Sequence, residues 1–185
     1  MTEHDDETLI GGTRITAGSV PPPVKRTVPA SGQESAWDYP RPPRVEPVPE
    51  RIRVVVGGLT VADSVRALRV LETAGAPVYY LPPGDVRTDL LQRTEHHSVC
   101  EFKGVANYHS LALPDRTIPN AAWAYPAPMS GYESLRDYLA FYAWRVDEAW
   151  VGEELATPQP GRFYGGWITS RVVGPFKGGP GSFGW

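Results

Sequence analysis

Short runs of β-branched and aromatic residues, separated by glycine and proline, recur along the chain from residue 51 onward. The runs 51–56 and 59–62 flank Gly57 and Gly58. Two such runs split by Gly-Gly predict a tight hairpin, because glycine tolerates the positive φ that the turn needs. Similar runs predict further strands over 77–81, 98–102, 105–113, 121–125, 139–144 and 148–152. The pattern therefore favours a domain built mainly from strands.

Three segments depart from this pattern. Residues 85–91 follow a glycine and begin with an acidic residue, which predicts a short helix. Residues 132–138 predict one or two helical turns. Residues 64–72 fit a helical face and an alternating strand almost equally well, and both interpretations stay open. We expect a mainly β fold, an α+β domain with one or two short helices.

The first fifty residues differ from the rest in composition and periodicity. They contain nine prolines and show neither helical nor strand periodicity. Proline lacks an N–H and disfavours helix in the residue before it, so residues 1–50 predict an extended, polyproline-type arm that is disordered or wraps the domain. Trp37 and Tyr39 are its large rings. We favour packing of these rings on their own domain over docking to a partner, because exposed aromatic surface is costly.

The last segment is rich in glycine and proline, yet it carries six large rings. Rings of this size bury roughly 150–250 Å² each, so we expect residues 157–185 to pack on the domain as an extension. The sequence thus predicts three parts: an arm over 1–50, a β domain over 51–156 and a C-terminal extension over 157–185.

Composition and charge exclude several classes of protein. The 185 residues include 20 Pro and 19 Gly, too many for a helical bundle, and a single cysteine, which excludes an internal disulfide framework. Residues 51–185 hold thirteen basic and thirteen acidic side chains, which argues against nucleic-acid binding. We find no apolar run of roughly 18 residues and no secretory signal, so we expect no membrane partner and a cytoplasmic setting.

A thiol, an amine and a phenol lie close together at Cys100, Lys103 and Tyr108. A neighbouring ammonium favours the thiolate, which is the nucleophilic form, so Cys100 and Lys103 are candidate catalytic residues. A free cysteine is more often a small buried hydrophobe, and we favour that interpretation. His96, His97, Cys100 and His109 lack the two tight pairs typical of zinc motifs, so no metal site and no cofactor are predicted.

Aromatic residues and one ionic pair are the candidate ligand contacts. The rings alternate with small or polar residues, and a domain of this size does not readily enclose them all, which predicts a ring-lined cleft. Arg87 and Asp89 offer a guanidinium fork for a carboxylate or phosphate, or else an internal ion pair that braces a loop; the two are equally favoured. The candidate ring contacts are Trp123, Tyr125, Phe141, Tyr142 and Trp144.

Several motifs occur in an order that resembles a known family. They are Ala62-Asp63-Ser64, Arg66-Ala67-Leu68, Val78-Tyr79-Tyr80, Asp85-Val86-Arg87, Cys100-x-Phe102-Lys103-Gly104, Ala122-Trp123-x-Tyr125 and Tyr138-Leu139-Ala140-Phe141-Tyr142. Over about residues 51–154 the chain resembles domain-of-unknown-function family 427, also labelled nucleotidyltransferase-like. The resemblance implies a small fold of two antiparallel sheets leaning together as a β-tent, as in methionine-sulfoxide reductase B. The structural zinc of many such proteins is not implied, because this chain lacks their Cys-x-x-Cys pairs.

Three functional hypotheses follow. We favour a small-molecule-binding β domain whose aromatic pocket is completed by Arg87, Lys103 and Tyr108 as polar contacts. The second hypothesis is an enzyme that uses Cys100 as nucleophile or redox centre. The third is an interaction protein whose proline-rich arm, including residues 42–49, binds partners through polyproline recognition.

Overall fold

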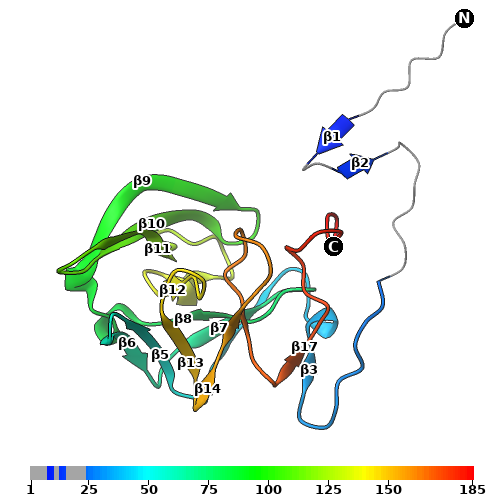
Figure 1. The fold of residues 1–185 in the computed structure, drawn as a ribbon, viewed down its shortest axis with the longest axis horizontal. Helices are drawn as coiled ribbons and strands as arrows, with labels where there is room; N and C mark the ends of the chain where they lie inside the picture. The colour runs from blue at the N-terminus through cyan, green and yellow to red at the C-terminus, as the bar shows by residue number, and fades with distance from the viewer. Residues whose placement is uncertain (1–7, 11–12, 16–23) are drawn as a thin grey trace, which may run out of the picture.

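The fold is mainly β, as predicted (Figure 1). A computed structural model describes residues 8–10, 13–15 and 24–185. Within these ranges the chain has seventeen strands and four short 3₁₀ helices, and no α-helix. No helix of this part of the chain is long and apolar enough to cross a lipid bilayer. Three larger antiparallel sheets and three two-stranded sheets result, whereas the tent arrangement stays a prediction.

The first larger sheet contains the predicted hairpin. Gly57 and Gly58 both adopt positive φ, +60° and +74°, between the two strands of the hairpin. The inward positions of β5 are completely buried and its alternate positions are half exposed, as expected for a sheet with one face on the core. The sheet order is β14-β13-β5-β6, with β5 at Ile52–Val56, β6 at Leu59–Ser64, β13 at Glu148–Val151 and β14 at Glu154–Leu155.

The second larger sheet buries both of its faces at its centre. Its order is β12-β11-β10-β9, with β9 at Leu91–Cys100, β10 at Gly104–Ala112, β11 at Thr117–Ala124 and β12 at Leu139–Phe141. The sequence predicted the start of β9 seven residues too late. Residues 91–97 are mostly polar because β9 is an edge strand with extensive solvent exposure, so hydrophobic periodicity did not reveal it.

The third larger sheet resolves the ambiguous segment and involves the proline-rich arm. Residues 64–72 contain a strand, β7, rather than a helix. The sheet order is β4-β7-β8, with β4 at Arg44–Pro47, β7 at Leu68–Leu71 and β8 at Val78–Tyr80. Because β4 pairs with β7, the central part of the segment 42–49 that was considered for partner recognition is occupied within the domain.

The remaining elements are short. The two-stranded sheets pair β1 (Thr8–Ile10) with β2 (Thr13–Ile15), β15 (Thr157–Pro158) with β16 (Trp167–Ile168), and β17 (Val172–Val173) with β3 (Glu34–Ser35), the last in parallel. The 3₁₀ helices are η1 (Ala36–Asp38), η2 (Pro83–Asp85), η3 (Thr88–Leu90) and η4 (Glu133–Leu135). The helix expected over 85–91 is thus two 3₁₀ turns, and that expected over 132–138 is a single turn.

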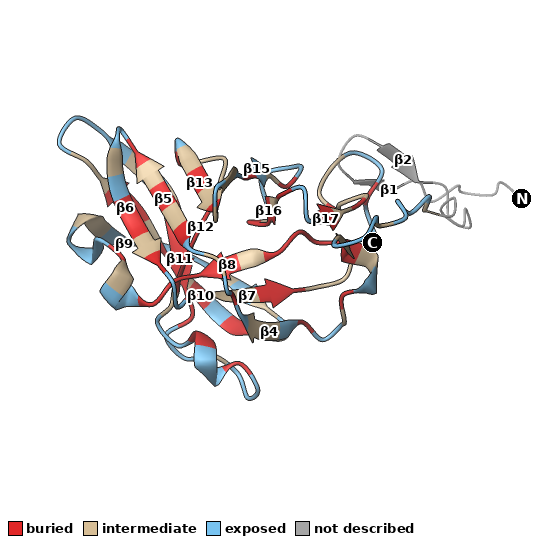
Figure 2. Ribbon diagram, turned by 90° about the horizontal axis from the view of Figure 1, so that it is seen from below, coloured by how far each residue is buried: buried red, intermediate tan, exposed pale blue. Residues whose placement is uncertain are grey.

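Buried residues follow β5, β6, β8 and β11 through the middle of the molecule (Figure 2) and form two main clusters. Strand alternation separates them across the second sheet. Ala122 and Phe141 face an aliphatic cluster built with β5 and β6. Trp123 and Ala140 face an aromatic cluster built with β7 and β8. The aromatic cluster is the side on which the candidate site lies.

Parts of the chain on both sides of the β domain, around Trp37 and around Trp167, pack on it. The Trp167 side chain is completely buried in the aliphatic cluster, and its indole Nε1 donates a hydrogen bond to the backbone oxygen of Phe141 at 2.9 Å. Tyr39 is buried, and Trp37 donates through Nε1 to the backbone oxygen of Pro175 at 2.8 Å. Residues 1–7, 11–12 and 16–23 of the predicted arm, which include the three consecutive prolines at 21–23, lie outside the described residues.

Candidate functional site

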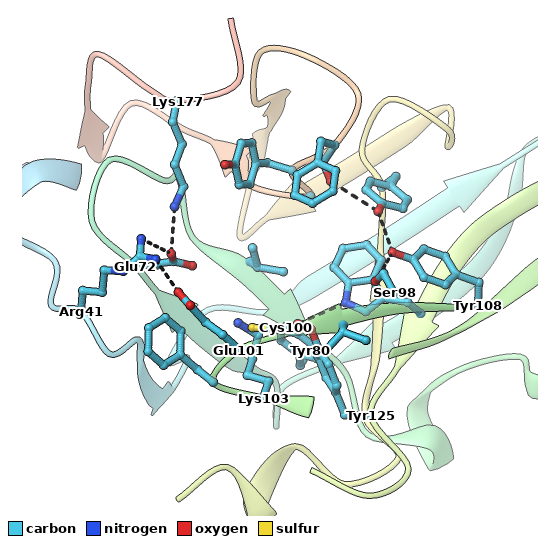
Figure 3. Close-up of a pocket in the computed structure, with 18 of the residues that line it drawn as sticks. Arg41, Glu72, Tyr80, Ser98, Cys100, Glu101, Lys103, Tyr108, Tyr125 and Lys177 are labelled. Atoms are coloured by element: carbon cyan, nitrogen blue, oxygen red, sulfur yellow. Dashed lines mark hydrogen bonds and ion pairs between the residues drawn. The ribbon is translucent and has the colours of Figure 1, made fainter. Parts of the chain in front are cut away.

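A cavity of about 490 Å³ lies between the second and third sheets and the C-terminal segment (Figure 3). Its floor comes from β8 and β11, its sides from β9, β10 and the turn between them, and its outer wall from residues 163–165. In Figure 1 the orange segment after β14 lies beside the end of the β9–β10 hairpin, consistent with this wall. The space is therefore formed by parts of the chain that are far apart in sequence.

Tyrosine and tryptophan rings form the floor of the cavity. Strand pairing sets Tyr108 directly opposite Trp123, so both rings emerge on the same face of the sheet. The Trp123 indole Nε1 donates a hydrogen bond to the Tyr80 hydroxyl at 3.2 Å. The Trp123 ring centroid lies 4.5 Å from that of Tyr142. These contacts hold the rings in fixed orientations around the empty volume.

The phenols of the floor remain neutral at ordinary pH. Burial raises the pKa of Tyr80, Tyr125 and Tyr142 far above the usual value for tyrosine. For Tyr142, the hydrogen bond with the Tyr108 hydroxyl raises the pKa further. The floor is thus apolar over the ring faces, with protonated hydroxyl groups as its polar atoms.

A chain of hydroxyl groups closes one side of the cavity. The Ser98 and Tyr108 hydroxyls lie 2.9 Å apart, and the Tyr108 and Tyr142 hydroxyls lie 3.4 Å apart. The Tyr142 hydroxyl donates to the backbone oxygen of Phe163 at 3.4 Å. This chain connects β9, β10 and the residue after β12 to the C-terminal segment, and Figure 3 shows it as a row of dashed contacts.

The turn between β9 and β10 brings Cys100 and Lys103 to the cavity. Gly104 opens β10 with φ of +99° and pairs with Cys100, which forces the intervening residues into a tight turn. Cys100 is a half-buried free cysteine. Lys103 is only 7% exposed, and its Nζ lies 6.0 Å from the centroid of the Tyr125 ring. Both side chains line the same space.

Lys103 differs from the other charged residues around the cavity. Among the described residues, Lys103 Nζ has neither an acidic group within ion-pairing distance nor a hydrogen-bond acceptor. The other four charged side chains of the lining form a connected network at the rim: Arg41, Glu72, Glu101 and Lys177. Glu72 accepts from Lys177 at 2.9 Å and from Arg41 at 3.5 Å, and Arg41 also binds Glu101 at 2.5 Å. Among the described residues, Lys103 is therefore the one charged side chain of the cavity lining without an internal partner.

The C-terminal segment lies against the floor without spare room at Gly165. A Cβ atom at this position would lie 2.1 Å from Cη2 of Trp123, far inside van der Waals contact. Glycine is thus required here by the close approach of backbone and ring rather than by its φ angle. The approach sets the position of Phe163 and Tyr164 over the cavity.

Replacing Gly165 with alanine is expected to displace the wall and lower the free energy of unfolding by about 1–3 kcal/mol, the usual cost of overpacking. Denaturant unfolding measures this loss, and the indole signal of Trp123 in NMR spectra should shift strongly. Gly84→Ala is the matched control, because Gly84 likewise lacks a positive φ and the nearest atom to its added Cβ, Nη2 of Arg66, would lie 3.9 Å away. An unshifted Trp123 signal in Gly165→Ala would contradict the close approach.

The predicted site residues fall into two sets. The cavity is lined by Cys100, Lys103, Tyr108, Trp123, Tyr125 and Tyr142. Phe141 points to the aliphatic cluster, because it is adjacent to Tyr142 on an alternating strand. Trp144 packs against the aromatic cluster beside the cavity. Arg87 and Asp89 lie away from it and bind each other at 2.7 Å on the surface.

Sequence reasoning did not find several residues of the cavity. Tyr80 lies in a predicted strand, but the sequence does not distinguish it from the neighbouring Tyr79. In the structure Tyr80 belongs to the aromatic cluster and Tyr79 to the aliphatic cluster. Glu72 and Lys177 are 105 residues apart, so no local signal connects them. Ser98 was part of a predicted strand but carried no motif.

The histidines near Cys100 lie in separate surroundings. The His96 ring lies 4.4 Å from that of Tyr108, and His97 contacts the backbone oxygen of Glu95. His109 Nδ1 is buried and has no hydrogen-bond partner among the residues that the structure describes. Burial, and after it the charge of Arg93, lowers the pKa of His109. In the part of the chain that the structure describes, no three metal-ligating side chains gather in one place.

Comparison with known proteins identifies the family but not the ligand. No curated protein matches the chain. Residues 44–152 match a family described as a domain of unknown function, DUF427. The matched segment includes β4 to β13 and therefore the floor of the cavity, whereas residues 163–165 of its outer wall lie beyond it. Because the match extends over more than half of the sequence, the chain belongs to the DUF427 family.

Proposed function

We propose that this protein binds a small molecule in the cavity between its second and third sheets, within the reducing cytoplasm. The observation that carries the proposal is the Lys103 side chain beside an aromatic floor: it is only 7% exposed, and its ammonium group has no acidic partner among the described residues. A buried charge is costly unless it is paired, so a site that leaves one free is well suited to a partner that comes from outside. The ring faces favour a flat ligand.

The proposed ligand combines a ring with an anionic or strongly accepting group. A volume of about 490 Å³ lies within the range of roughly 300–1,000 Å³ that is usual for small-molecule sites. A ring that lies over Trp123 and Tyr80 would contact apolar surface on both sides of their shared hydrogen bond. A carboxylate or enolate on this ring would meet Lys103 at the turn, and the Ser98–Tyr108 hydroxyls would serve as further polar contacts.

A thermal-shift screen tests this proposal with benzoate, indole-carboxylates, uncharged benzamide and aliphatic acetate. We expect aromatic carboxylates to raise the melting temperature in a saturable manner, and the matched amides and acetate to have smaller effects. The cavity variant Ser98→Val removes one polar contact, whereas Ser170→Val changes a hydroxyl outside the cavity and serves as control. An absence of stabilisation by every aromatic anion would contradict the proposal.

A catalytic role of Cys100 is the second candidate, favoured by its position in the same cavity as Lys103. A bound ligand would then lie against a thiol. The discriminating experiment compares binding and consumption of the same aromatic compounds by the native protein and Cys100→Ser. Turnover lost on substitution, with binding retained, supports catalysis; identical behaviour of both proteins with no turnover leaves binding as the whole function.

A further inference from the structure

A second, smaller cavity lies on the other side of the hydroxyl chain. Its volume is about 250 Å³, and it shares Ser98, Tyr108, Tyr142 and Phe163 with the main cavity. The chain of hydroxyl groups is thus a partition between two spaces. The remaining lining residues of the smaller space are His96, Asn120, Arg145 and Arg162.

The charge of this second cavity is of one sign. Two arginines line it and no acidic residue does. Arg145 and Arg162 take part in no ion pair within residues 24–185 and the two short N-terminal strands. Most other arginines of the fold bind a carboxylate, as Arg116 does with Asp147 at 3.3 Å. Two unpaired guanidinium groups at one hollow therefore stand out from the rest of the surface.

Trp144 holds both guanidinium groups in place. The Arg145 Cζ lies 4.1 Å from the centroid of the Trp144 ring, and the Arg162 Cζ lies 5.7 Å from it. Stacking on an aromatic face orients a guanidinium group and leaves its edge free to donate hydrogen bonds. The Nε atom of Arg145 is buried and has no hydrogen-bond partner in the described part of the chain. A buried donor without an acceptor is rare in folded proteins, and a ligand acceptor would satisfy it.

We propose that the second cavity is an oxyanion site that takes a doubly charged group of the phosphate type. Two fixed positive charges without a nearby carboxylate favour a dianion over a monoanion, and guanidinium groups donate paired hydrogen bonds to phosphate oxygens. Asn120 adds a polar group: its Oδ1 accepts from Thr94 at 2.8 Å, so its amide hydrogens remain available as donors. The site is distinct from that of the aromatic ligand proposed above, since Arg145 and Arg162 line only the second cavity, although the two spaces share the residues of the partition.

Titration of ¹⁵N-labelled full-length protein with inorganic phosphate, phenyl phosphate, sulfate and acetate at constant ionic strength tests this assignment. The readouts are the Arg145 Nε–H and the Trp144 indole N–H. We expect saturable shifts with the phosphates and with sulfate, and weaker ones with acetate. Arg145→Gln and Arg162→Gln should each weaken phosphate binding about tenfold or more, the usual effect of losing a charged hydrogen bond. Arg145→Lys should retain part of the affinity.

Arg116→Gln is the matched control, because this arginine is paired and lies outside the cavity. It should bind phosphate like the native protein. Arg162 is exposed, so Arg162→Gln tests the site even if the Arg145 variants fold poorly. A chloride titration measures the effect of an anion in general. Phosphate shifts that rise linearly, that chloride reproduces equally, or that persist unchanged in Arg162→Gln would overturn the site. Acetate binding as tight as phosphate binding would overturn its assignment to dianions.

Discussion

Replacing Trp167 with alanine is expected to lower the free energy of unfolding by about 3–5 kcal/mol. The indole is completely buried, its ring centroid lies 5.2 Å from that of Tyr79, and its Nε1 is bonded to the backbone oxygen of Phe141. Truncation would remove apolar contacts from the aliphatic cluster and leave that carbonyl without its donor. Urea-induced unfolding followed by circular dichroism measures the change.

Phe183→Ala is the control for this experiment. Phe183 belongs to the same C-terminal segment but is 72% exposed, so its loss should change the stability by no more than about 0.5 kcal/mol. The stability of a conservative Trp167→Phe variant should lie between those of Trp167→Ala and Phe183→Ala. Equal stabilities of Trp167→Ala and Phe183→Ala would mean that residues after 157 are not part of the folded core.

Replacing Lys103 with methionine is expected to have opposite effects on stability and on binding. The side chain is largely buried and its ammonium group has no counter-ion among the described residues, so an apolar side chain of similar length should raise the free energy of unfolding by about 1–3 kcal/mol. Binding of aromatic carboxylates should fall at least about tenfold, because the charge that would meet them is gone. Denaturant unfolding and calorimetric titration measure the two quantities.

Lys177→Met is the matched control, since Lys177 is buried to a similar degree but is bonded to Glu72. Its removal should destabilise the protein, because Glu72 then loses a buried partner and keeps only Arg41. We thus expect the same substitution to change the free energy of unfolding in opposite directions at the two lysines. A loss of stability in Lys103→Met comparable to that in Lys177→Met would show that Lys103 has a structural role, and would remove the main support for the proposed ligand.

Local sequence patterns were sufficient to predict part of the fold. Gly57 and Gly58 between two strand-forming runs predicted the first hairpin, since that turn depends on adjacent residues alone. Cys100, Lys103 and Tyr108 were recognised as neighbours because they lie on one hairpin. The rings of the predicted strand 121–125 were likewise predicted to line a cleft from their alternation with small or polar residues, and Trp123 and Tyr125 do line the cavity.

Other features depend on information that is not local. Which of Phe141 and Tyr142 faces the cavity is decided by the register of β12 with β11, and a shift by one residue would exchange them. The start of β9 was missed because its residues 91–97 pair through the backbone and are mostly polar on the surface. Lys177 lies beside Glu72 because the C-terminal segment follows a particular path over the domain. The glycines and prolines of this segment predict where turns occur, but they do not predict that path.

The outer wall of the main cavity comes from residues that follow the segment shared with the family. The matched residues 44–152 supply the floor and the Cys100–Gly104 turn, whereas Phe163, Tyr164 and Gly165 lie beyond them. If the cavity binds a ligand as proposed, changes at the end of the chain alone would alter its outer wall without disturbing the sheets. Grafting extensions from other family members onto this β domain would be a direct route to altered selectivity.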